Sequence, residues 1–374
     1  MFSSISGRFA AISIAVFLLA GYGAAATVWA ADNDAADATR HKQAFIEAMA
    51  PQGTQRQVIA IVALNQGTEM TDLLVPHAVL KRADIAGIQM VAPRRGPVSL
   101  YPALQVQATQ DFAGFDQLHP QGADYVIVPA MEPDNDPAVM AWLQGQAQLG
   151  ARIIAVCSGA RVAGQAGLLD GRRFAGHWYD RSTLLKRHPG AVHVPDRRYL
   201  ADRGVATTTG ITASVPTMLA LVEALGGPDK AARLAEELGV EYWGPAHDSD
   251  AFGVNFSRGF EYALNKAAFW RDSERAIDVS DGMDDIALAL AVDAWSRTGH
   301  ARVVAASPSG PVTLRSGLIL DARPAAQNVP RLSLAKNIKP VQQLDAALSE
   351  IAARYGDARR DWVMQEMEYS GAVR

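Results

Sequence analysis

The stretch Arg152–Gly167 reads Arg-Ile-Ile-Ala-Val-Cys-Ser-Gly-Ala-Arg-Val-Ala-Gly-Gln-Ala-Gly and joins an apolar run to a segment rich in small residues. The run Arg152–Val156 is typical of a buried strand, and Ser158–Leu169 is typical of a helix. Cys157 lies between the two. A sharp strand-to-helix turn holds a nucleophile in a strained backbone at the carboxyl end of a sheet, and the helix start favours its thiolate. Cys157 is therefore the candidate nucleophile, although a buried, inert cysteine has similar surroundings.

Strand and helix patterns alternate along the chain on both sides of this turn. The predicted strands are Val58–Leu64, Ile88–Ala92, Val98–Ala108 and Asp124–Pro129. The predicted helices are Thr71–Arg82, Pro137–Gly150, Thr212–Leu225 and Asp229–Leu238. Thr71–Arg82 is predicted to be amphipathic, with Leu73, Leu74, Val79 and Leu80 on its apolar side. Such alternation predicts an α/β fold in which helices cover both faces of a parallel sheet.

The composition excludes several classes of protein. With 374 residues, 49% hydrophobic and 20% charged, the chain has a globular balance. A net charge of −4 gives no cationic excess, so we expect no nucleic-acid partner. One cysteine excludes an internal disulfide and a cysteine-based zinc site. We predict no cofactor and no metal, because the run His247-Asp248-Ser249-Asp250 is more typical of a solvated turn than of a metal site.

The N-terminal segment has the pattern of an export signal. No charged residue occurs from Phe9 to Ala31, and Ala10–Leu19 is strongly apolar. The uncharged run also reaches the roughly 20 residues that cross a bilayer. Cleavage near Ala30 and retention as a membrane anchor through residues 9–31 therefore both stay open. In either case we expect a periplasmic location, free or anchored to the membrane.

The C-terminal part repeats features of the front part. Met70-Thr71-Asp72 recurs as Met283-Asp284-Asp285, and Gly96–Leu100 recurs as Gly310–Leu314, at offsets that differ by one residue. Asp229–Tyr242 and Asp357–Tyr369 are similar helical segments that both end in Glu-Tyr. Chance likeness between two amphipathic helices is the alternative. The repeat predicts a shortened second copy that lacks the cysteine turn. The resulting division is 1–31 signal or anchor, 32–57 connector, 58–242 main domain, 243–272 linker and 273–374 partial repeat.

The cysteine turn and the residues after it carry a resemblance to a known family. Val156–Ala160, Ala166–Arg173 and His177-Trp178 resemble the ThiJ/PfpI superfamily, which is class I glutamine amidotransferase-like. Within it, the chain is most similar to the N-terminal domain of GlxA-type regulators of the AraC family. The resemblance covers about 58–242 and implies a flavodoxin-like sheet sandwiched by helices, followed here by the shortened copy.

The resemblance also implies the roles of four residues. Cys157 would be the nucleophile. Asp72, four residues before Pro76, would be the acid that contacts the sulfur and moves protons. His177 would lie near the thiol, although packing against Trp178 explains it equally simply. Ser158 would supply a backbone N–H to an oxyanion hole.

Departures from the family pattern limit the functional prediction. Ser158 replaces the histidine that follows the cysteine in family peptidases, whereas Asp72 and Ser158 resemble isonitrile-hydratase-like members. Ala130-Met131 replaces the Gly-Gly that builds a second oxyanion donor in many members, which puts catalysis in doubt. The tail lacks a recognisable helix-turn-helix, so direct transcriptional control is disfavoured.

Two functions follow from these observations. The first is a cysteine-dependent hydratase or lyase-like activity on a small electrophile, favoured by Asp72, Cys157 and His177 together. The alternative is a non-catalytic domain that binds a small ligand or senses oxidants through Cys157, which Ala130-Met131 favours. Either function takes a small-molecule partner, and a homodimer remains open.

Overall fold

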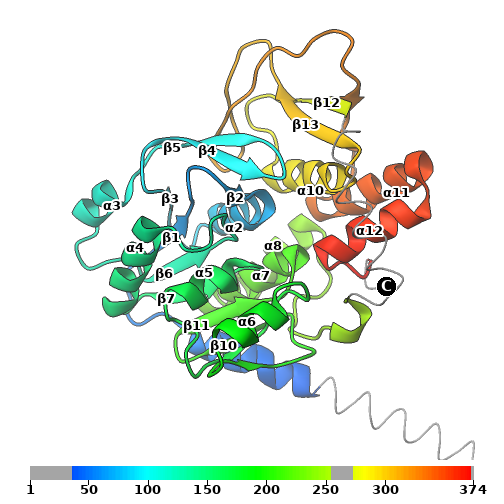
Figure 1. The fold of residues 1–374 in the computed structure, drawn as a ribbon. Helices are drawn as coiled ribbons and strands as arrows, with labels where there is room; N and C mark the ends of the chain where they lie inside the picture. The colour runs from blue at the N-terminus through cyan, green and yellow to red at the C-terminus, as the bar shows by residue number, and fades with distance from the viewer. Residues whose placement is uncertain (1–35, 254–272, 372–374) are drawn as a thin grey trace, which may run out of the picture.

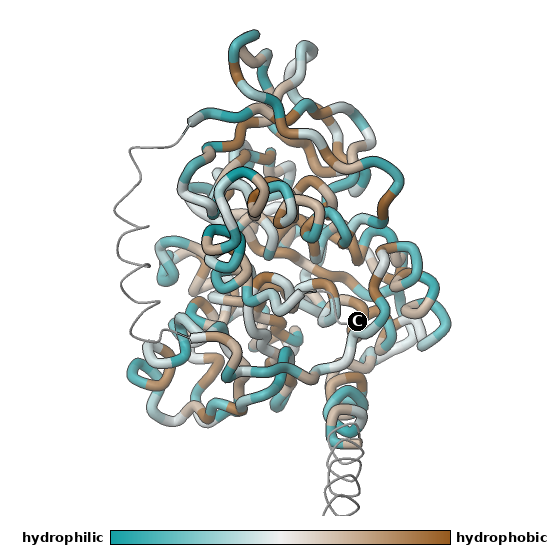
Figure 2. Tube along the Cα trace, turned by 90° about the vertical axis from the view of Figure 1, so that its right-hand side faces the viewer, coloured by the Kyte–Doolittle hydropathy of each residue, from teal (hydrophilic) through white to brown (hydrophobic). Residues whose placement is uncertain are grey.

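The computed structural model describes residues 36–253 and 273–371 (Figure 1). The predicted signal or anchor and most of the predicted linker lie outside the described residues. Within the described ranges, no helix is long and apolar enough to cross a membrane. In Figure 2 hydrophobic residues concentrate on inner segments of the chain and hydrophilic ones on outer turns, as in a globular fold.

A six-stranded sheet forms the centre of the molecule, in the order β10-β11-β7-β6-β1-β3. Its strands are β1 (Gln57–Val62), β3 (Ala86–Val91), β6 (Tyr125–Val128), β7 (Arg152–Ala155), β10 (Tyr199–Asp202) and β11 (Val205–Thr208). All neighbours pair in parallel except β10, which runs antiparallel to β11 at one edge. This arrangement confirms the predicted α/β fold with a parallel sheet.

Helices cover both faces of this sheet because successive strand residues point to opposite sides. On β1, Ile59 and Ile61 join the core under α2 (Met70–Ala83), α7 (Ser214–Gly226) and α8 (Pro228–Leu238). Ala60 and Val62 join a second core under α3 (Phe112–Leu118), α4 (Pro137–Gln148) and α5 (Gly159–Gln165). The smaller elements are β8 (Arg173–Phe174), α6 (Arg181–Arg187), β9 (Val192–His193), η1 (Ile211–Ala213) and η2 (Ser249–Ala251).

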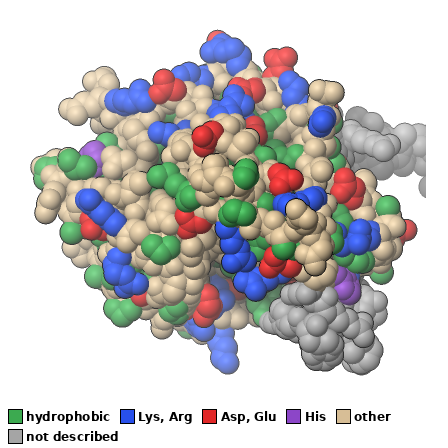
Figure 3. Space-filling view, turned by 90° about the horizontal axis from the view of Figure 1, so that it is seen from above, with side chains coloured by type: hydrophobic (Ala, Val, Ile, Leu, Met, Phe, Trp, Pro, Cys, Tyr) green, Lys and Arg blue, Asp and Glu red, His purple; other side chains and the backbone are tan. Residues whose placement is uncertain are grey.

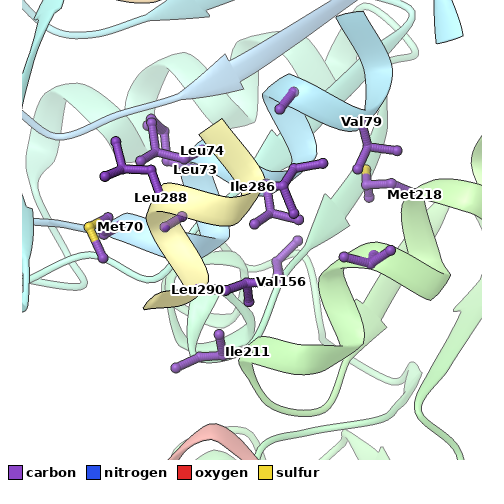
Figure 4. Close-up of a cluster of buried hydrophobic side chains, with 14 of the residues drawn as sticks. Met70, Leu73, Leu74, Val79, Val156, Ile211, Met218, Ile286, Leu288 and Leu290 are labelled. Carbon is purple, nitrogen blue, oxygen red and sulfur yellow. The ribbon is translucent and has the colours of Figure 1, made fainter. Parts of the chain in front are cut away.

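Helix α2 is buried on nearly all sides, so the prediction of a polar outer face is wrong. The polar residues Thr71, Asp72 and His77 are buried along with the apolar ones. The reason is a second covering helix, α10 (Asp285–Ser296), which packs on α2 in addition to α7. Figure 4 shows side chains of α2, α7 and α10 meeting in one cluster, with Val156 and Ile211 beside them.

The C-terminal part repeats the order of the front elements. Its three-stranded sheet has the order β13-β12-β16, formed by β12 (Ser273–Asp278), β13 (Ala301–Ala306) and β16 (Arg331–Leu332). β12 is parallel to both neighbours, as β1 is parallel to β3 and β6. The helices α11 (Gln343–Tyr355) and α12 (Asp357–Met367) follow after the short η4 (Pro340–Gln342), just as α7 and α8 follow the strands of the front part in chain order.

The corner between the last two helices has the same backbone in both parts. Gly227 joins α7 to α8 with φ 85° and ψ 165°, and Gly356 joins α11 to α12 with φ 88° and ψ 163°. Both helices that follow are 11 residues long. Glu368 therefore lies at the helix end that Gly239 occupies in the front part, rather than in register with Glu241 as the sequence match suggests.

Two hairpins join the front part, residues 58–242, to the C-terminal or rear part, residues 273–374, at their edges. The predicted strand Val98–Ala108 is in fact the hairpin β4 (Gly96–Tyr101) and β5 (Gln105–Ala108), because the chain turns at 102–104. Its counterpart is β14 (Val312–Thr313) with β15 (Ile319–Leu320), and β15 pairs antiparallel with β5. With β2 (Thr68–Glu69) they form one sheet, β14-β15-β5-β4-β2. The two parts are thus joined by strand pairing as well as by helix packing.

The predicted connector 32–57 contains a helix that packs on the main domain. Residues 36–48 form a helix, and Phe45 and Met49 are buried in the main core. The Phe45 ring lies 4.7 Å from the Tyr199 ring, and the Tyr125 hydroxyl donates to the carbonyl of Met49 at 2.7 Å. The apolar pair Phe45 and Met49, four residues apart, is the pattern of one helix face.

Candidate functional site

Cys157 occupies a strained turn between β7 and α5. Its φ is 53°, in the left-handed region that non-glycine residues rarely adopt. The Cys157 N–H donates to Thr208 Oγ1 of β11 at 3.0 Å, which helps to hold that conformation. Two residues later, a Cβ on Gly159 would lie 2.0 Å from the Val128 carbonyl oxygen, so the backbone approaches β6 too closely for a side chain. The small residues of this segment thus permit the turn.

The thiol of Cys157 is not a ready thiolate. Burial raises its pKa well above the ordinary value, and the carboxylates of Asp72, Glu69 and Asp180 raise it further. The Ser158 N–H opposes this change only in part. The expectation that the helix start favours the thiolate is therefore wrong, because burial and neighbouring acids outweigh the effect of a helix of seven residues. The reaction of Cys157 requires a base.

Asp72 lies in the first turn of α2 and is completely buried. Its Oδ2 accepts the Ala130 N–H at 3.1 Å, while its Oδ1 is buried without a hydrogen-bond partner. Burial raises the pKa of Asp72 to about 8, against the opposing effects of the Ala130 N–H and Arg297. A carboxyl group that ionises near neutral pH beside a thiol is suited to moving a proton.

Glu69 is a second acid of the site, and the sequence reasoning missed it. Its Oε2 accepts the Asp72 N–H at 2.6 Å and caps α2, and its Oε1 lies 2.8 Å from Arg297 Nη2. Burial raises its pKa well above the ordinary value, with further increases from Asp72 and Asp293. The sequence signal was an acid two residues before the predicted helix Thr71–Arg82, which proves to be the capping position of α2.

Ser158 is fixed by a polar network beside the thiol. Its hydroxyl lies 3.9 Å from Cys157 Sγ and donates to Asp180 Oδ2. Asp180 in turn lies 3.7 Å from Arg161, which also pairs with Asp134 at 2.6 Å. These contacts hold the turn that presents the Ser158 N–H toward the sulfur.

His177 lies in the same pocket as Cys157, but its hydrogen bond goes elsewhere. Its Nε2 is 3.3 Å from the carbonyl oxygen of Glu366, and its ring packs 5.5 Å from that of Trp178. The Trp178 Nε1–H also reaches this segment, donating to Gln365 O at 2.9 Å. His177 Nδ1 is buried without a partner. Contacts with α12 therefore hold His177 at the pocket wall, and its hydrogen bond is made to that helix instead of to the thiol.

A pocket of about 660 Å³ lies over the cysteine turn. Cys157, Ser158 and His177 line it, whereas Asp72 lies beneath the lining. Aromatic and apolar side chains supply much of the wall: Leu100, Tyr101, Met131, Trp178, Tyr179, Ile211 and Trp362. The C-terminal part contributes seven lining residues: Ser296, Arg297, Thr298, Gly299, Arg359, Trp362 and Glu366. The volume is in the range that binds small organic molecules.

The Ala130-Met131 pair changes the usual oxyanion arrangement in a specific way. The Ala130 N–H donates to Asp72, and the Ala130 carbonyl accepts the Glu69 N–H at 2.8 Å. Met131 forms an isolated bridge with Thr68 and lines the pocket. This segment therefore anchors the two acids, and the Ser158 N–H is the donor directed at the sulfur.

The remaining polar run near 247 has structural contacts. His247 Nε2 lies 3.3 Å from Glu368 Oε1, and Asp248 caps the turn that follows it. In the part of the chain that the structure describes, no cluster of three or more His, Cys, Asp or Glu residues could hold a metal ion. Figure 3 shows acidic and basic side chains interspersed over the upper face.

Comparisons with known proteins give the same family as the sequence motifs. The profile of the DJ-1/PfpI family matches residues 57–224. An isonitrile hydratase of Pseudomonas putida is 32% identical over 205 residues, covering 54% of this chain and 86% of that protein. The transcriptional regulator CdhR of Pseudomonas aeruginosa is 30% identical over 130 residues, covering 34% of this chain and 38% of the regulator.

Solved structures give matches to the front part. A ThiJ/PfpI family protein from Pseudomonas syringae matches with a TM-score of 0.46 at 24% identity, covering 51% of this chain and 78% of that one. Drosophila melanogaster DJ-1beta matches with a TM-score of 0.45 at 19% identity, covering 50% of this chain and 100% of that one. From the match to the hydratase over most of its length, together with the family profile, the chain belongs to the DJ-1/PfpI family.

Proposed function

We propose that the protein is a cysteine-dependent hydratase of small electrophiles, with isonitriles as the first substrates to test. One observation carries the proposal: the sole cysteine opens into a pocket beside Asp72, whose Oδ1 has no hydrogen-bond partner. A relative named isonitrile hydratase, 32% identical, supports this choice of substrate.

The raised pKa of the thiol determines the first step. Ionised Asp72 accepts the thiol proton as Cys157 Sγ bonds to the isonitrile carbon, and it then delivers that proton to the same carbon. The C≡N bond becomes C=N, and the product of this step is a thioimidate. The pKa of Asp72 is about 8, and that of the thiol lies well above its ordinary value. Near pH 8 Asp72 is therefore partly ionised while the thiol is protonated, so Asp72 can act as the base.

Water completes the reaction and restores the cysteine. Its oxygen bonds to the thioimidate carbon, one proton goes to nitrogen, and the other returns to sulfur as the C–S bond breaks. The product is an N-substituted formamide. The Ser158 N–H stabilises negative charge on sulfur, and the unpartnered His177 Nδ1 is available to orient water.

A second candidate is a ligand-binding domain without turnover. The observation that favours it is the Ala130 N–H, which is engaged by Asp72 instead of facing a substrate oxygen. Within this alternative, ligand binding is better supported than redox sensing. Oxidants react with thiolates, and the pKa of Cys157 is raised.

Turnover of an isonitrile panel by the wild type and by Cys157→Ser tests the proposal. We expect the wild type to form the N-substituted formamide and the variant to lose at least about a thousandfold in rate, as expected for loss of a nucleophile. Undiminished turnover by the variant would eliminate Cys157 as the nucleophile. A wild type that only gains thermal stability with these compounds would favour the binding domain.

We also propose that residues 1–31 direct export to the periplasm. The support is the uncharged run Phe9–Ala31. N-terminal sequencing of protein from membrane and periplasmic fractions tests this: a start near Ala31 indicates cleavage, and an intact chain in the membrane indicates an anchor. Recovery of the intact chain in the cytoplasm alone would contradict export.

A further inference from the structure

Arg297, from the C-terminal part, enters the site of the front part. It follows α10 directly, and its side chain is only 9% exposed. Its Nη2 lies 2.8 Å from Glu69 Oε1, its Nε lies 2.7 Å from Asp293 Oδ1, and its Nη1 lies 3.6 Å from Glu366 Oε2. It also lines the pocket. One guanidinium thus joins β2, α10 and α12 around the reactive turn.

A short chain of contacts leads from Arg297 to Asp72. Glu69 receives the guanidinium on Oε1 and the Asp72 N–H on Oε2, so Arg297 fixes the residue that caps α2. A parallel link runs through Asp293, whose second oxygen accepts the Thr71 hydroxyl at 2.8 Å. Both links hold the first turn of α2, where Asp72 lies.

The charges of this cluster are unequal. Glu69, Asp72, Asp293 and Glu366 are four carboxyl groups around a single guanidinium, with the Tyr101 ring 5.6 Å from Arg297. Asp72 faces Glu69 on β2, Asp293 and Arg297 on the α10 side, and Cys157 in the turn between β7 and α5. Buried carboxylates that lose their cation hold protons to higher pH.

We propose that Arg297 is a positioning residue that holds Glu69 and Asp72 in place and stabilises the carboxylate form of Asp72, so that the C-terminal part is a working component of the site. This inference rests on the proposed function, because it assigns Asp72 the role of base. Arg297 positions Asp72 through Glu69, since its ion pairs are with Glu69, Asp293 and Glu366. Its charge also favours the ionised form of Asp72.

The test follows kcat/KM for isonitrile hydration against pH in Arg297→Gln, Arg297→Lys and a matched control, Arg302→Gln. Arg302 is an exposed residue of β13 in the same part of the chain and does not line the pocket. In the wild type we expect kcat/KM to rise with pH as Asp72 ionises, and we call this rise the basic limb of the profile. Arg297→Gln should move the basic limb to higher pH by about one unit and lower kcat/KM about tenfold at neutral pH. Arg297→Lys should return the limb most of the way to its wild-type pH, and the profile of Arg302→Gln should match that of the wild type.

A second variant covers the case in which Arg297→Gln does not fold. Asp293→Asn removes a carboxylate that raises the pKa of Asp72 and frees the guanidinium for Glu69. It should therefore move the limb in the opposite direction, to lower pH. An unchanged limb in folded Arg297→Gln, or an upward shift in Asp293→Asn, would overturn the inference.

Failure of the proposed function is distinguishable from failure of this inference. Turnover by Cys157→Ser would reject the nucleophile whatever Arg297 does. A wild type without turnover would leave the pH dependence of iodoacetamide alkylation as the readout, since Cys157 is the sole thiol. There, a limb that moves to higher pH in Arg297→Gln but not in Arg302→Gln supports the inference, and coincident limbs contradict it.

Discussion

Helices α2 and α10 begin alike, yet only the aspartate in the first turn of α2 lies beside Cys157. Each carries a buried aspartate in its first turn, Asp72 in α2 and Asp285 in α10, and burial raises the pKa of both. Asp285 is fully satisfied: Ser316 donates its hydroxyl to Oδ1 and its N–H to Oδ2 at 3.1 Å. Asp72 has one donor, and its Oδ1 has none.

The difference shows how the same helix start can have two roles. Ser316 gives Asp285 a complete set of hydrogen bonds, so that carboxylate holds a loop in place. Asp72 has no such serine partner and lies instead beside the cysteine turn, a feature that the rear part lacks. An incompletely bonded acid beside a thiol can take up a proton, whereas a satisfied one cannot do so without breaking contacts.

Replacing each aspartate in turn gives the largest expected contrast. Asp72→Asn should lower kcat/KM for hydration by about 10² to 10⁴-fold, because the base is lost. Asp285→Asn should leave kcat/KM within about twofold and instead lower the free energy of unfolding by about 1–3 kcal/mol, because its charge-assisted bonds weaken. Steady-state kinetics and urea unfolding measure the two effects. Equal losses of activity would mean that the two acids have the same role.

Two glycine substitutions test whether the cysteine turn needs its close approach to β6. Gly159→Ala should destabilise the protein by about 1–3 kcal/mol or more, because the added Cβ would lie 2.0 Å from the Val128 carbonyl oxygen. The control, Gly145→Ala in α4, meets nothing within 4 Å and should stabilise by about 0.5–1 kcal/mol. Thermal unfolding distinguishes them, and a neutral Gly159→Ala would show that the close approach to β6 is not required.

The corner glycines should give the smallest contrast, because there the two parts agree. Gly227 and Gly356 share nearly the same φ and ψ, in a region that is almost exclusive to glycine. Gly227→Ala and Gly356→Ala should each cost about 1–3 kcal/mol of unfolding free energy, with similar values for the two. A cost confined to one of them would contradict the equivalence of the two helix corners.

Sequence reasoning recovered the local patterns better than the contacts between distant segments. The run Arg152–Val156 followed by small residues was sufficient to place Cys157 on a strained turn, and alternation gave the parallel sheet. It misjudged α2 because the polar residues Thr71 and His77 indicate an exposed face, and nothing local shows that α10 covers them. The burial of the thiol, which reverses the expected change in its pKa, also depends on such packing.

Arg297 was missed for the same reason. In sequence it is an arginine at the end of an apolar helix, four residues after Asp293, which is the spacing of an ordinary helical ion pair. Its contacts with Glu69 and Glu366 arise from folding the rear part onto the front part. The one available signal was Asp293 itself, an acid within the apolar helix Asp285–Ser296.

The pH dependence of kcat/KM for isonitrile hydration tests the central claim most directly, with the wild type and Asp72→Asn measured side by side. The pKa of Asp72 is raised to about 8, so its base form is scarce below that pH and predominates above it. We predict that wild-type kcat/KM rises through about pH 8 and that this limb is absent in Asp72→Asn. A wild-type profile that is flat or falls through this range, or a limb that persists in Asp72→Asn, would contradict the assignment of Asp72 as the base for Cys157.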